Sequence, residues 1–489
     1  MGCSIGTAYK RVSLSDTVGK ITSVKEILVQ PGLFVNLNPN KFQELYKVGP
    51  VLGVGGNSEV RVCYNRDTEE KRAVKIFRKY KKNDQEDTET KSEIRILKYL
   101  DHPSIIRVFE YFEDKRRIYL LMEYCSGGEL FSEILDGKIL SEISIAKIMQ
   151  QLFSALAYLH ERKIIHRDIK PENILLEENE NMLNIKLIDF GSAVICKGTH
   201  FKGKAGSYLF AAPEVASDVY SFKCDMWSAG VILSLLLTGQ PPYNILSQSS
   251  IQYLTPDQKF GYEDEVWDRI SIEARDLLEK LLCDEKSRAT AKECLSHPWI
   301  VQKSYRPICN ENILNSVLNK LRNFHSFHKL REAVYSFIIS QFISIKETRL
   351  LREIFRTLDK NGDGKLSIEE LTEQYAETLG DDEAKREALR IMNEVDTDNN
   401  GYIDYTEFLK VNLDSHKVLS NENLKKAFRM FDKDDSGTIT AAELKLVLQG
   451  DFESEDSVWN EIVSMVDQNS DGEIDLQEFQ DMILSNCLN

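Results

Sequence analysis

The sequence predicts a multidomain protein in which an α+β region is followed by an all-α region. Alternating apolar and polar residues from Tyr46 to about Leu100 are typical of a small β-sheet with one helix. From Gly128 to Ile300 the apolar residues recur at helical spacing, and further along the chain one segment recurs four times. A chain of 489 residues is too long for one hydrophobic core, and its length fits about three domains.

Acidic residues are concentrated in the last third of the chain. Residues 351–489 contain 33 Asp and Glu against 14 Lys and Arg, whereas the rest of the chain has 45 against 48. The formal net charge of -16 therefore belongs to this C-terminal region. Such a distribution argues against a nucleic-acid-binding protein and predicts a module that binds cations.

The cysteine pattern and the short apolar segments indicate the compartment. Nine cysteines, an odd number, are scattered without a CxxC pair, so reduced thiols in the cytoplasm are expected. The N-terminal residues contain no apolar signal core, and stretches such as "AGVILSLLL" are too short to span a bilayer. We therefore expect a cytoplasmic protein that is neither secreted nor integral to a membrane.

These patterns divide the chain into four regions. Residues 1–45 are weakly patterned and are expected to form a flexible N-terminal extension. Two folded regions are expected at 46–300 and 346–489, and the segment 301–345 between them reads as a basic amphipathic junction helix.

The repeats of the C-terminal region start at residues 359, 396, 432 and 467, which are 37, 36 and 35 residues apart. This spacing fits a helix–loop–helix unit whose loop has oxygen-bearing side chains at its first, third, fifth and last positions. Calcium needs about seven oxygen ligands, so a short loop has to wrap around the ion. A glycine at position six permits the turn, the final glutamate can bind with both oxygens, and the carbonyl at position seven completes the shell.

The predicted calcium ligands occupy the loops 359–370, 396–407, 432–443 and 467–478. They are Asp359, Asn361, Asp363, Lys365 and Glu370; Asp396, Asp398, Asn400, Tyr402 and Glu407; Asp432, Asp434, Ser436, Thr438 and Glu443; and Asp467, Asn469, Asp471, Glu473 and Glu478.

An apolar residue at position eight of each loop predicts that the loops pair two by two through a short strand bridge, giving two lobes. Four acidic surface loops that resemble ligand sets by chance are the alternative, which the constant period argues against. The repeats resemble the EF-hands of calmodulin. A calcium buffer is the other functional alternative, but a buffer needs no large upstream domain.

The upstream region begins with a glycine-rich segment, "LGVGGNSEV", which follows a strand pattern. Glycine lets the backbone approach a phosphate closely, although the segment alone is a weak signal and has Ser58 where a third glycine is expected. Further on, "AVK" contains Lys75 and the helical "SEIRIL" contains Glu93. Each of these two residues alone would be interpreted as an ordinary surface charge.

Stronger signals follow in a fixed order. The segment "HRDIKPEN" places Asp168, Lys170 and Asn173 in one short loop, and "IDFG" places Asp189 at the end of a strand. "AAPE", "CDMWSAG" and Arg288 come next. This ordered set resembles the protein kinases over residues 46–300, and the resemblance implies their bilobal α+β fold.

The resemblance implies a role for the groups that bind ATP and magnesium. Phosphoryl transfer needs positioning and charge neutralisation more than covalent chemistry. Lys75, held by Glu93, would bind the α and β phosphates. Asn173 and Asp189 would bind magnesium.

By the same resemblance, Asp168 and Lys170 are the predicted catalytic residues. Asp168 would orient the substrate hydroxyl and accept its proton, while Lys170 would steady the γ phosphate. Lys170 within "DIKPEN" is typical of serine/threonine kinases. Glu172 resembles the acid that related kinases direct at an upstream arginine, which implies protein substrates with basic residues before the serine or threonine.

The resemblance also places the nucleotide. Met122 would be the gatekeeper, although it fits an ordinary core methionine as well, and the hinge would be "EYC", which contains Glu123 and Cys125. Glu129 resembles the acid that contacts the ribose. The remaining predicted nucleotide-binding residues form the glycine-rich segment: Leu52, Gly53, Val54, Gly55, Gly56, Asn57, Ser58, Glu59 and Val60.

The activation segment departs from the family pattern. "GSYLFAAPE" has Ser207 in place of the usual threonine, and Leu209 and Phe210 in place of tyrosines. Ser207 keeps a hydroxyl for hydrogen bonds to the catalytic loop. No acidic residue between Gly191 and Ala212 stands in for a phosphate, which leaves open whether Arg167 needs a phosphate partner.

The junction has apolar residues at helical spacing from Leu314 to Phe342, with lysine and arginine between them. Basic amphipathic helices of this kind are bound by calmodulin-like lobes in their apolar grooves. The alternative is a plain packing helix, but the position between the two folded regions favours regulation.

A kinase-like domain, this junction and four EF-hands in one chain resemble the calcium-dependent protein kinases of plants and protists. The resemblance implies a serine/threonine kinase that uses ATP, magnesium and calcium. Its junction would block the substrate groove or hold the lobes inactive until calcium lets the EF-hand lobes bind it as their intramolecular target. The alternative is a catalytically inactive calcium-responsive scaffold, which the presence of Lys75, Asp168 and Asp189 argues against.

The first residues predict a peripheral membrane contact. Gly2 is a myristoylation candidate and Cys3 a palmitoylation candidate, with Lys10 and Arg11 nearby for anionic lipid. One acyl chain binds membranes only marginally, so both signals would be needed. Gly6 replaces the usual serine or threonine, which weakens the motif.

Overall fold

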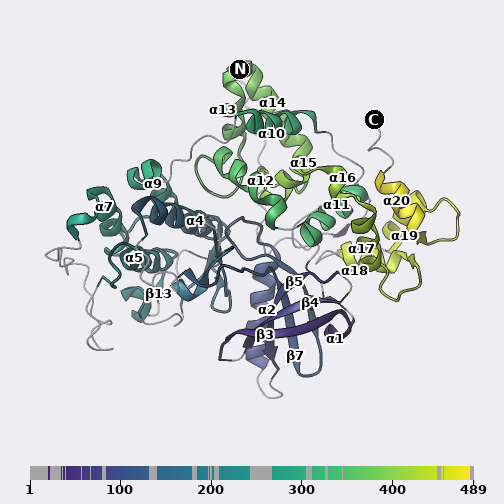
Figure 1. Ribbon diagram of the computed structural model, residues 1–489, viewed down its shortest axis with the longest axis horizontal. Coiled ribbons are helices and arrows are strands. Elements are labelled where there is room, and N and C mark those ends of the chain that lie inside the picture. The colour runs from purple at the N-terminus through teal and green to yellow at the C-terminus, as the bar shows by residue number, and fades with distance from the viewer. Residues whose placement is uncertain are drawn as a thin grey trace.

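The structure is a computed structural model (Figure 1). It describes residues 20–21, 35, 37–38, 40–56, 58–66, 68–79, 84–130, 140–178, 184–196, 198, 201–202, 209–217, 219–242, 267–303, 311–324, 329–343, 345–448, 453–454 and 456–484. Gly2, Cys3, Asn57 and Ser207 lie outside these residues. Among the described helices, none combines the length and the apolar character that a membrane span requires.

The first lobe of the α+β region is built on one six-stranded sheet. The strands lie in the order β2, β6, β7, β5, β4, β3, and all neighbours are antiparallel except the parallel pair β2 and β6. Helix α2 (Asp84–Lys98) supplies Ile94 and Leu97 to the core beneath this sheet. The strands are β2 (Leu37–Asn38), β3 (Tyr46–Val54), β4 (Ser58–Asn65), β5 (Lys71–Arg78), β6 (Val108–Glu113) and β7 (Arg117–Met122).

Part of the N-terminal extension is folded onto this sheet, which differs from the flexible segment that we expected. Strand β2 lies beside β6, and helix α1 (Phe42–Leu45) packs Phe42 into a small aromatic core. The ring of Phe42 stacks on Tyr46 and Tyr119, with ring centroids 5.6 and 4.5 Å away. These elements are too short to show a periodic pattern, so the sequence alone did not reveal them.

The second lobe is mainly helical. In α5 every residue from Cys224 to Leu236 is buried, and a Cβ on Gly230 would lie 2.8 Å from Cβ of Leu281, so glycine permits the close approach of α5 and α7. One hydrophobic core runs through both lobes. The helices are α4 (Glu142–Glu161), α5 (Lys223–Thr238), α7 (Ile272–Leu281), α8 (Ala291–Leu295), α9 (Pro298–Lys303), and the short 3-10 helices η3 (Pro171–Asn173), η4 (Pro213–Ser217) and η5 (Trp267–Arg269).

Short antiparallel strand pairs carry the loops of this lobe. They are β8 (Ile164–Ile165) with β11 (Val194–Ile195), β9 (Ile174–Leu176) with β10 (Ile185–Leu187), and β12 (Phe201–Lys202) with β13 (Val219–Tyr220).

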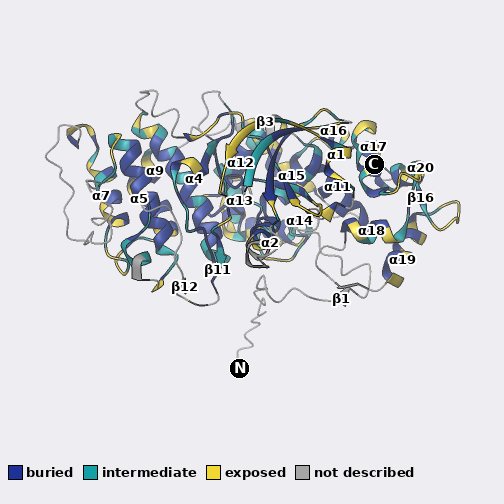
Figure 2. Ribbon diagram, turned by 90° about the horizontal axis from the view of Figure 1, so that it is seen from below, coloured by how far each residue is buried: buried dark blue, intermediate teal, exposed yellow. Residues whose placement is uncertain are grey.

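The C-terminal region is all-α apart from three short strands, and it has its own hydrophobic core (Figure 2). The junction forms two helices in place of the one expected, α10 (Glu311–Asn323) and α11 (Lys329–Phe342). The later helices are α12 (Ile345–Leu358), α13 (Ile368–Leu379), α14 (Asp381–Val395), α15 (Tyr405–Asn412), α16 (Ser415–Val418), α17 (Asn421–Phe431), α18 (Ala441–Leu448), α19 (Asp456–Val466) and α20 (Leu476–Leu484).

The four repeat loops pair two by two, as the apolar residue at position eight predicted. Leu366 and Ile403 exchange both backbone hydrogen bonds, at 3.0 and 2.9 Å. In the second pair, β14 (Thr438–Ile439) lies antiparallel to β16 (Ile474–Asp475). The short strand β1 (Lys20–Ile21) runs parallel to β15 (Glu453–Ser454), between α18 and α19.

Replacing Phe42 by alanine tests the folded part of the extension. Because Phe42 is 2% exposed and stacked between two rings, Phe42→Ala is expected to lower the stability of the first lobe by about 3–5 kcal/mol. The thermal unfolding midpoint should fall by roughly 6–15 °C. Ile272→Ala, at a side chain that is 79% exposed, is the control and should leave the midpoint unchanged. An unchanged midpoint for Phe42→Ala would contradict the packing of this segment.

Candidate functional site

A lysine shared by two carboxylates joins the two lobes. Strand β5 carries Lys75, α2 carries Glu93, and Asp189 follows β10. The Nζ atom of Lys75 lies 2.7 Å from Oε1 of Glu93 and 2.8 Å from Oδ1 of Asp189. Lys75 and Glu93 are buried, so little water competes for these contacts.

The charges of this cluster depend on one another. Burial alone would lower the pKa of Lys75, but the two carboxylates outweigh it and hold that pKa above its usual value. Burial raises the pKa of Glu93, and Lys75 offsets only part of the rise. For Asp189 the opposite holds, because Lys75 outweighs burial and lowers the pKa. The lysine therefore remains a cation between the two lobes, which suits an anionic ligand.

The predicted catalytic groups lie together in the loop that follows β8. The ammonium of Lys170 donates to Oδ2 of Asp168 at 2.8 Å. The side-chain amide of Asn173 donates to the same carboxylate oxygen at 3.0 Å and to the backbone carbonyl of Asp168 at 2.8 Å. Pro171 begins η3 and gives this loop its sharp turn. The carboxylate of Asp168 is thus oriented by at least two donors.

Asp225, at the start of α5, supports this loop from below. Its carboxylate accepts hydrogen bonds from the backbone amides of His166 and Arg167, at 3.0 and 2.9 Å, and contacts Nε2 of His160 at 2.9 Å. Burial would raise the pKa of Asp225, but the contact with His160 outweighs it and the pKa falls below its usual value. The backbone at Arg167 has a φ of +67°, a strained conformation that these two amide bonds stabilise.

The "IDFG" segment is anchored by aromatic packing. The rings of His166 and Phe190 meet edge to face with centroids 4.8 Å apart, and Phe190 is fully buried. His166 also lies 3.2 Å from the carbonyl of Ile188 through Nε2. This packing directs Asp189 toward Lys75 and away from the core.

The buried ion pair of Arg288 and Glu214 fixes the "AAPE" segment. Nη2 of Arg288 donates to Oε2 of Glu214 at 3.1 Å, a second bond joins Nη1 to Oε1, and Arg288 is only 1% exposed. Such a two-point contact sets orientation as well as position. The segment that precedes α5 is therefore tied to the body of the second lobe.

The nucleotide-binding residues predicted from the glycine-rich segment line the hairpin of β3 and β4. The amide of Gly55 donates to the carbonyl of Ser58 at 2.7 Å and closes the hairpin. A Cβ on Gly53 or Gly56 would meet nothing within 4 Å. Open space next to bare backbone is what a phosphate needs to approach amide groups.

In the predicted hinge, the side chains contact the protein itself. The side chain of Glu123 faces Lys186 at 2.8 Å and accepts the amide of Arg107, so only its backbone carbonyl remains for a base. Cys125 is half-buried and packs against the core, as Met122 does. Glu129 is exposed at the other end of the hinge segment.

All four repeat loops adopt one conformation. The glycine at position six has a φ between +83° and +89° in each loop, and its amide donates to the first aspartate at 2.8 to 2.9 Å. The last glutamate accepts backbone amides from both arms of its loop, as Glu407 does from Thr397 and Asp404. This arrangement turns the predicted ligand oxygens toward the inside of the loop.

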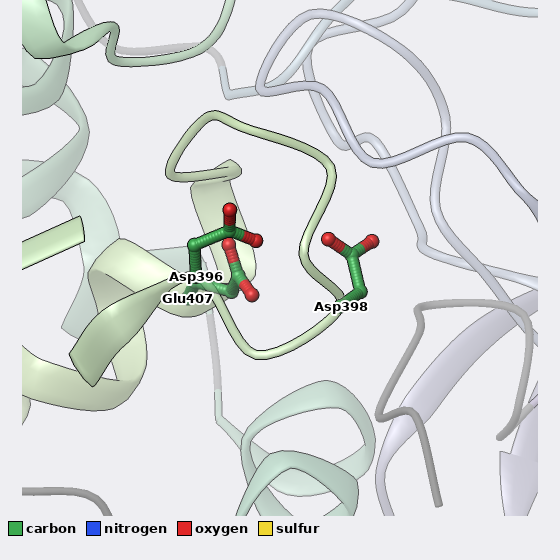
Figure 3. Close-up of side chains that lie close together, drawn as sticks. All are labelled: Asp396, Asp398 and Glu407. Atoms are coloured by element: carbon green, nitrogen blue, oxygen red, sulfur yellow. The ribbon is translucent and has the colours of Figure 1, made fainter. Parts of the chain in front are cut away.

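Carboxylates gather inside the second loop, which Figure 3 shows, and inside the third loop. In the second loop, one oxygen each of Asp396, Asp398 and Glu407 lies within 4.8 Å of the others. The third loop brings together Asp432, Asp434 and Glu443 in the same way. In the first and fourth loops the third position is an asparagine, so an amide oxygen takes the place of one carboxylate.

The donor set of these loops fits calcium. Burial raises the pKa of Asp398 to about 9 and that of Glu407 to about 8, and neighbouring carboxylates add to both rises. In the first loop, burial raises the pKa of Asp363 to about 6. A divalent cation would neutralise this crowding of negative charge, and oxygen donors only are what calcium prefers.

The first EF-hand pair lies directly against the α+β region through two arginines of α12. Arg352 is 2% exposed and pairs with Glu177. Arg356 donates to Oε1 of Gln151 at 2.7 Å and to Oδ1 of Asn184 at 2.8 Å. This surface was not predicted from the sequence. The one available signal was the spacing of four residues between the two arginines, which places them on one helix face.

The calcium loops themselves also contact the kinase-like domain. The side chain of Lys365, at position seven of the first loop, donates to Glu161 at 2.7 Å. A Cβ on Gly364 would lie 2.1 Å from Cδ2 of His102, so the loop backbone rests on that ring. In the second loop, the amide of Thr406 donates to Asp101 at 2.8 Å. Any change of loop shape is therefore transmitted to residues 101–102 and the end of α4.

The C-terminal end of junction helix α11 lies on the six-stranded sheet. Arg72 donates to the carbonyl of Gln341 at 3.0 Å, and Arg107 donates to that of Ser340 at 3.3 Å. The side-chain amide of Gln341 donates through Nε2 to the backbone carbonyl of Phe109 at 3.2 Å. Two cations at a helix C-terminus donate hydrogen bonds to its last carbonyls and interact favourably with the negative end of its dipole.

The fold and the geometry of the site define a protein kinase fused to two EF-hand pairs. Residues 46–300 match the protein kinase domain family, and residues 348–411 and 421–484 match the EF-hand domain pair.

Whole-chain relatives carry the same combination. The chain is 38% identical to calcium-dependent protein kinase 4 of Plasmodium falciparum, over 99% of this chain and 93% of the relative. It is 35% identical to calcium-dependent protein kinase 33 of Arabidopsis thaliana, over 90% of this chain and 84% of the relative. The chain belongs to the calcium-dependent protein kinase family, and it is a serine/threonine protein kinase with a calcium-binding regulatory domain.

Replacing Glu407 by glutamine tests the pairing of the loops. Removal of one carboxylate charge from the second loop is expected to weaken its calcium binding roughly tenfold or more. The first loop should weaken as well, because Leu366 and Ile403 join the two backbones. The third and fourth loops, which pair with each other, should keep their affinity.

Calorimetric calcium titration of the full chain provides the measurement, and Glu383→Gln, at an exposed glutamate of α14, is the matched control. Equal weakening of all four sites would contradict two independent pairs.

Proposed function

We propose that the protein transfers the γ phosphate of ATP to serine or threonine of protein substrates when calcium occupies its EF-hands. The observation that carries the proposal is the joint presence of two assembled clusters. One contains Lys75, Glu93 and Asp189, and the other contains Asp168, Lys170 and Asn173.

Each cluster has a defined task in this proposal. Lys75 binds the α and β phosphates once the nucleotide draws it from Asp189, and Glu93 keeps its ammonium in place. Asp189 and Asn173 hold magnesium, which neutralises charge on the transferred group. Asp168 orients the substrate hydroxyl and takes its proton, and Lys170 moves from Asp168 to the γ phosphate.

Exposed carboxylates favour basic substrates. Glu172 in the catalytic loop and Glu129 after the hinge are both exposed. An arginine upstream of the phosphorylated residue would find a carboxylate there, which supports a preference for basic peptides.

The junction is the intramolecular target of the EF-hand lobes in this proposal. Its apolar residues, including Leu321, Val334 and Ile338, belong to the core of the EF-hand region. Tyr375 donates to the carbonyl of Leu318 at 2.6 Å. The rings of Phe337 and Phe431 meet edge to face with centroids 5.1 Å apart. In this proposal, helices held in this way leave the substrate groove open.

We infer that the docked arrangement corresponds to the calcium-loaded, active protein. The support is that a complete Lys75–Glu93 contact coexists with a bound junction and with calcium loops pressed against the kinase domain. Without calcium, the crowded carboxylates would distort the loops, release the junction and undo the contacts at Asp101 and His102.

Calcium titration of activity tests the proposal. Phosphate transfer to a basic serine peptide should rise steeply between roughly 10⁻⁷ and 10⁻⁵ M free calcium, the range of sensor EF-hands. Asp168→Asn should lower the rate roughly a hundredfold or more at every calcium level. A variant with glutamine at positions 370, 407, 443 and 478 should stay at the calcium-free rate. Equal activity with and without calcium would contradict the regulation, and an active Asp168→Asn protein would contradict the role of Asp168.

Arg352→Met tests the docking. Because the change leaves the buried Glu177 with only the more distant Lys186, 3.8 Å away, docking should weaken. By linkage, the calcium needed for half-maximal activity should rise roughly tenfold. Arg386→Met, at an exposed arginine of α14, is the matched control and should behave like the wild type. An unshifted calcium curve for Arg352→Met would separate docking from activation.

A further inference from the structure

The catalytic-loop arginine Arg167 faces an activation segment without acidic residues. Residues 192–211 contain three lysines and no aspartate or glutamate. In kinases that are switched at this segment, phosphorylation orders it through new pairs between arginine and the phosphate. When this segment supplies neither a phosphate nor a carboxylate, other groups have to hold Arg167.

Three neutral groups of the described residues contact the guanidinium of Arg167. Its Nε donates to the carbonyl of Ser192 at 2.6 Å, and its Nη1 donates to the hydroxyl of Tyr220 at 3.3 Å. The guanidinium carbon lies over the ring of Phe201, 4.8 Å from its centroid. Within the part of the chain that the structure describes, no carboxylate forms an ion pair with this side chain.

The two aromatic residues are positioned together by the strand pair β12 and β13. Phe201 and Tyr220 are directly opposite in the register, and their ring centroids are 6.0 Å apart. Tyr220 is fully buried, and burial raises the pKa of its hydroxyl, which therefore stays neutral at physiological pH. The strand pair thus brings a π face and a hydrogen-bond acceptor to one cation from two distant parts of the sequence.

A guanidinium over an aromatic face gains electrostatic energy from the ring quadrupole, and the gain is larger where water is excluded. The same residue occupies a strained backbone conformation at a φ of +67°, and Asp168 follows it directly. A fixed Arg167 side chain therefore limits the motion of the neighbouring catalytic carboxylate. Since Ser192 lies just after the "IDFG" segment, the contact also ties that segment to the catalytic loop.

We propose that Phe201 and Tyr220 are positioning residues that hold Arg167 in place of a phosphate, so that this kinase reaches full activity without phosphorylation of its activation segment. The inference goes beyond calcium control, because it concerns how the catalytic loop is held once the EF-hands are loaded. It explains how Arg167 is held although the activation segment is basic and has no acidic residue in place of a phosphate.

The experiment uses the full chain at saturating calcium after phosphatase treatment, with mass spectrometry showing that residues 192–211 carry no phosphate. Wild-type kcat should be unchanged by the treatment. Phe201→Leu should lower kcat roughly 2- to 30-fold with little change in the KM for ATP, because the cation loses its aromatic face. Tyr220→Phe should lower kcat by a smaller factor, and Tyr64→Phe on strand β4 is the matched control.

Phe201→Glu separates a role toward Arg167 from a role in folding. A carboxylate at this position would pair with the guanidinium, so phosphate-free Phe201→Glu should retain a kcat well above that of Phe201→Leu. Thermal midpoints measured in parallel show whether each variant is folded. Loss of wild-type activity on phosphatase treatment would overturn the proposal, and so would equal losses in Phe201→Leu and Phe201→Glu or an undiminished kcat in Phe201→Leu.

Discussion

The ammonium of Lys75, shared between Glu93 and Asp189, is the contact that joins the two lobes and on which the proposed active arrangement depends. It joins a strand, a helix and a loop from both lobes, and Lys75 and Glu93 are buried where water is scarce. Removal of the cation would leave two carboxylates close together in a site of low polarity, so the lobes would separate or α2 would move. Every feature that holds β5, α2 or the "IDFG" segment therefore contributes to catalysis indirectly.

The regulatory domain contacts elements that position this triad. Arg72 lies three residues before Lys75 on β5 and binds the end of α11, while α12 and the first calcium loop contact Glu177, Glu161 and His102. Buried ion pairs such as Arg352 with Glu177 contribute little net stability, because desolvation offsets much of the attraction. Removing one partner of such a pair is costly, because the other charge stays buried without compensation. The docking is therefore specific in geometry and still reversible. A reversible and specific contact is what a calcium switch requires.

Much of the architecture could be predicted from the sequence, and the reasons are physical. A calcium loop is a local structure, so its ligands lie at fixed spacings such as Asp396, Asp398 and Glu407. The predicted catalytic groups are far apart along the chain, but their order in the segments that carry them is distinctive. The structure pairs Lys75 with Asp189 and Lys170 with Asp168.

Contacts between distant and weakly patterned segments could not be predicted. Strand β2 and helix α1 are too short to show periodicity, so the fold of residues 37–45 appeared only in three dimensions. Arg352 looks like an ordinary helix-surface charge until Glu177 is placed opposite it. The pairing of Phe201 with Tyr220 around Arg167 depends on two strands of two residues each.

The central claim is that calcium controls whether the EF-hand region is docked on the kinase domain. Hydrogen–deuterium exchange of the full chain, with calcium and with chelator, measures this directly at residues 101–112 and 151–178, which carry the docking contacts. We predict slower amide exchange in both segments with calcium, and slower exchange in α2 at the same calcium concentration. Identical exchange in the two conditions, together with calcium-dependent activity, would contradict docking as the link between calcium and catalysis.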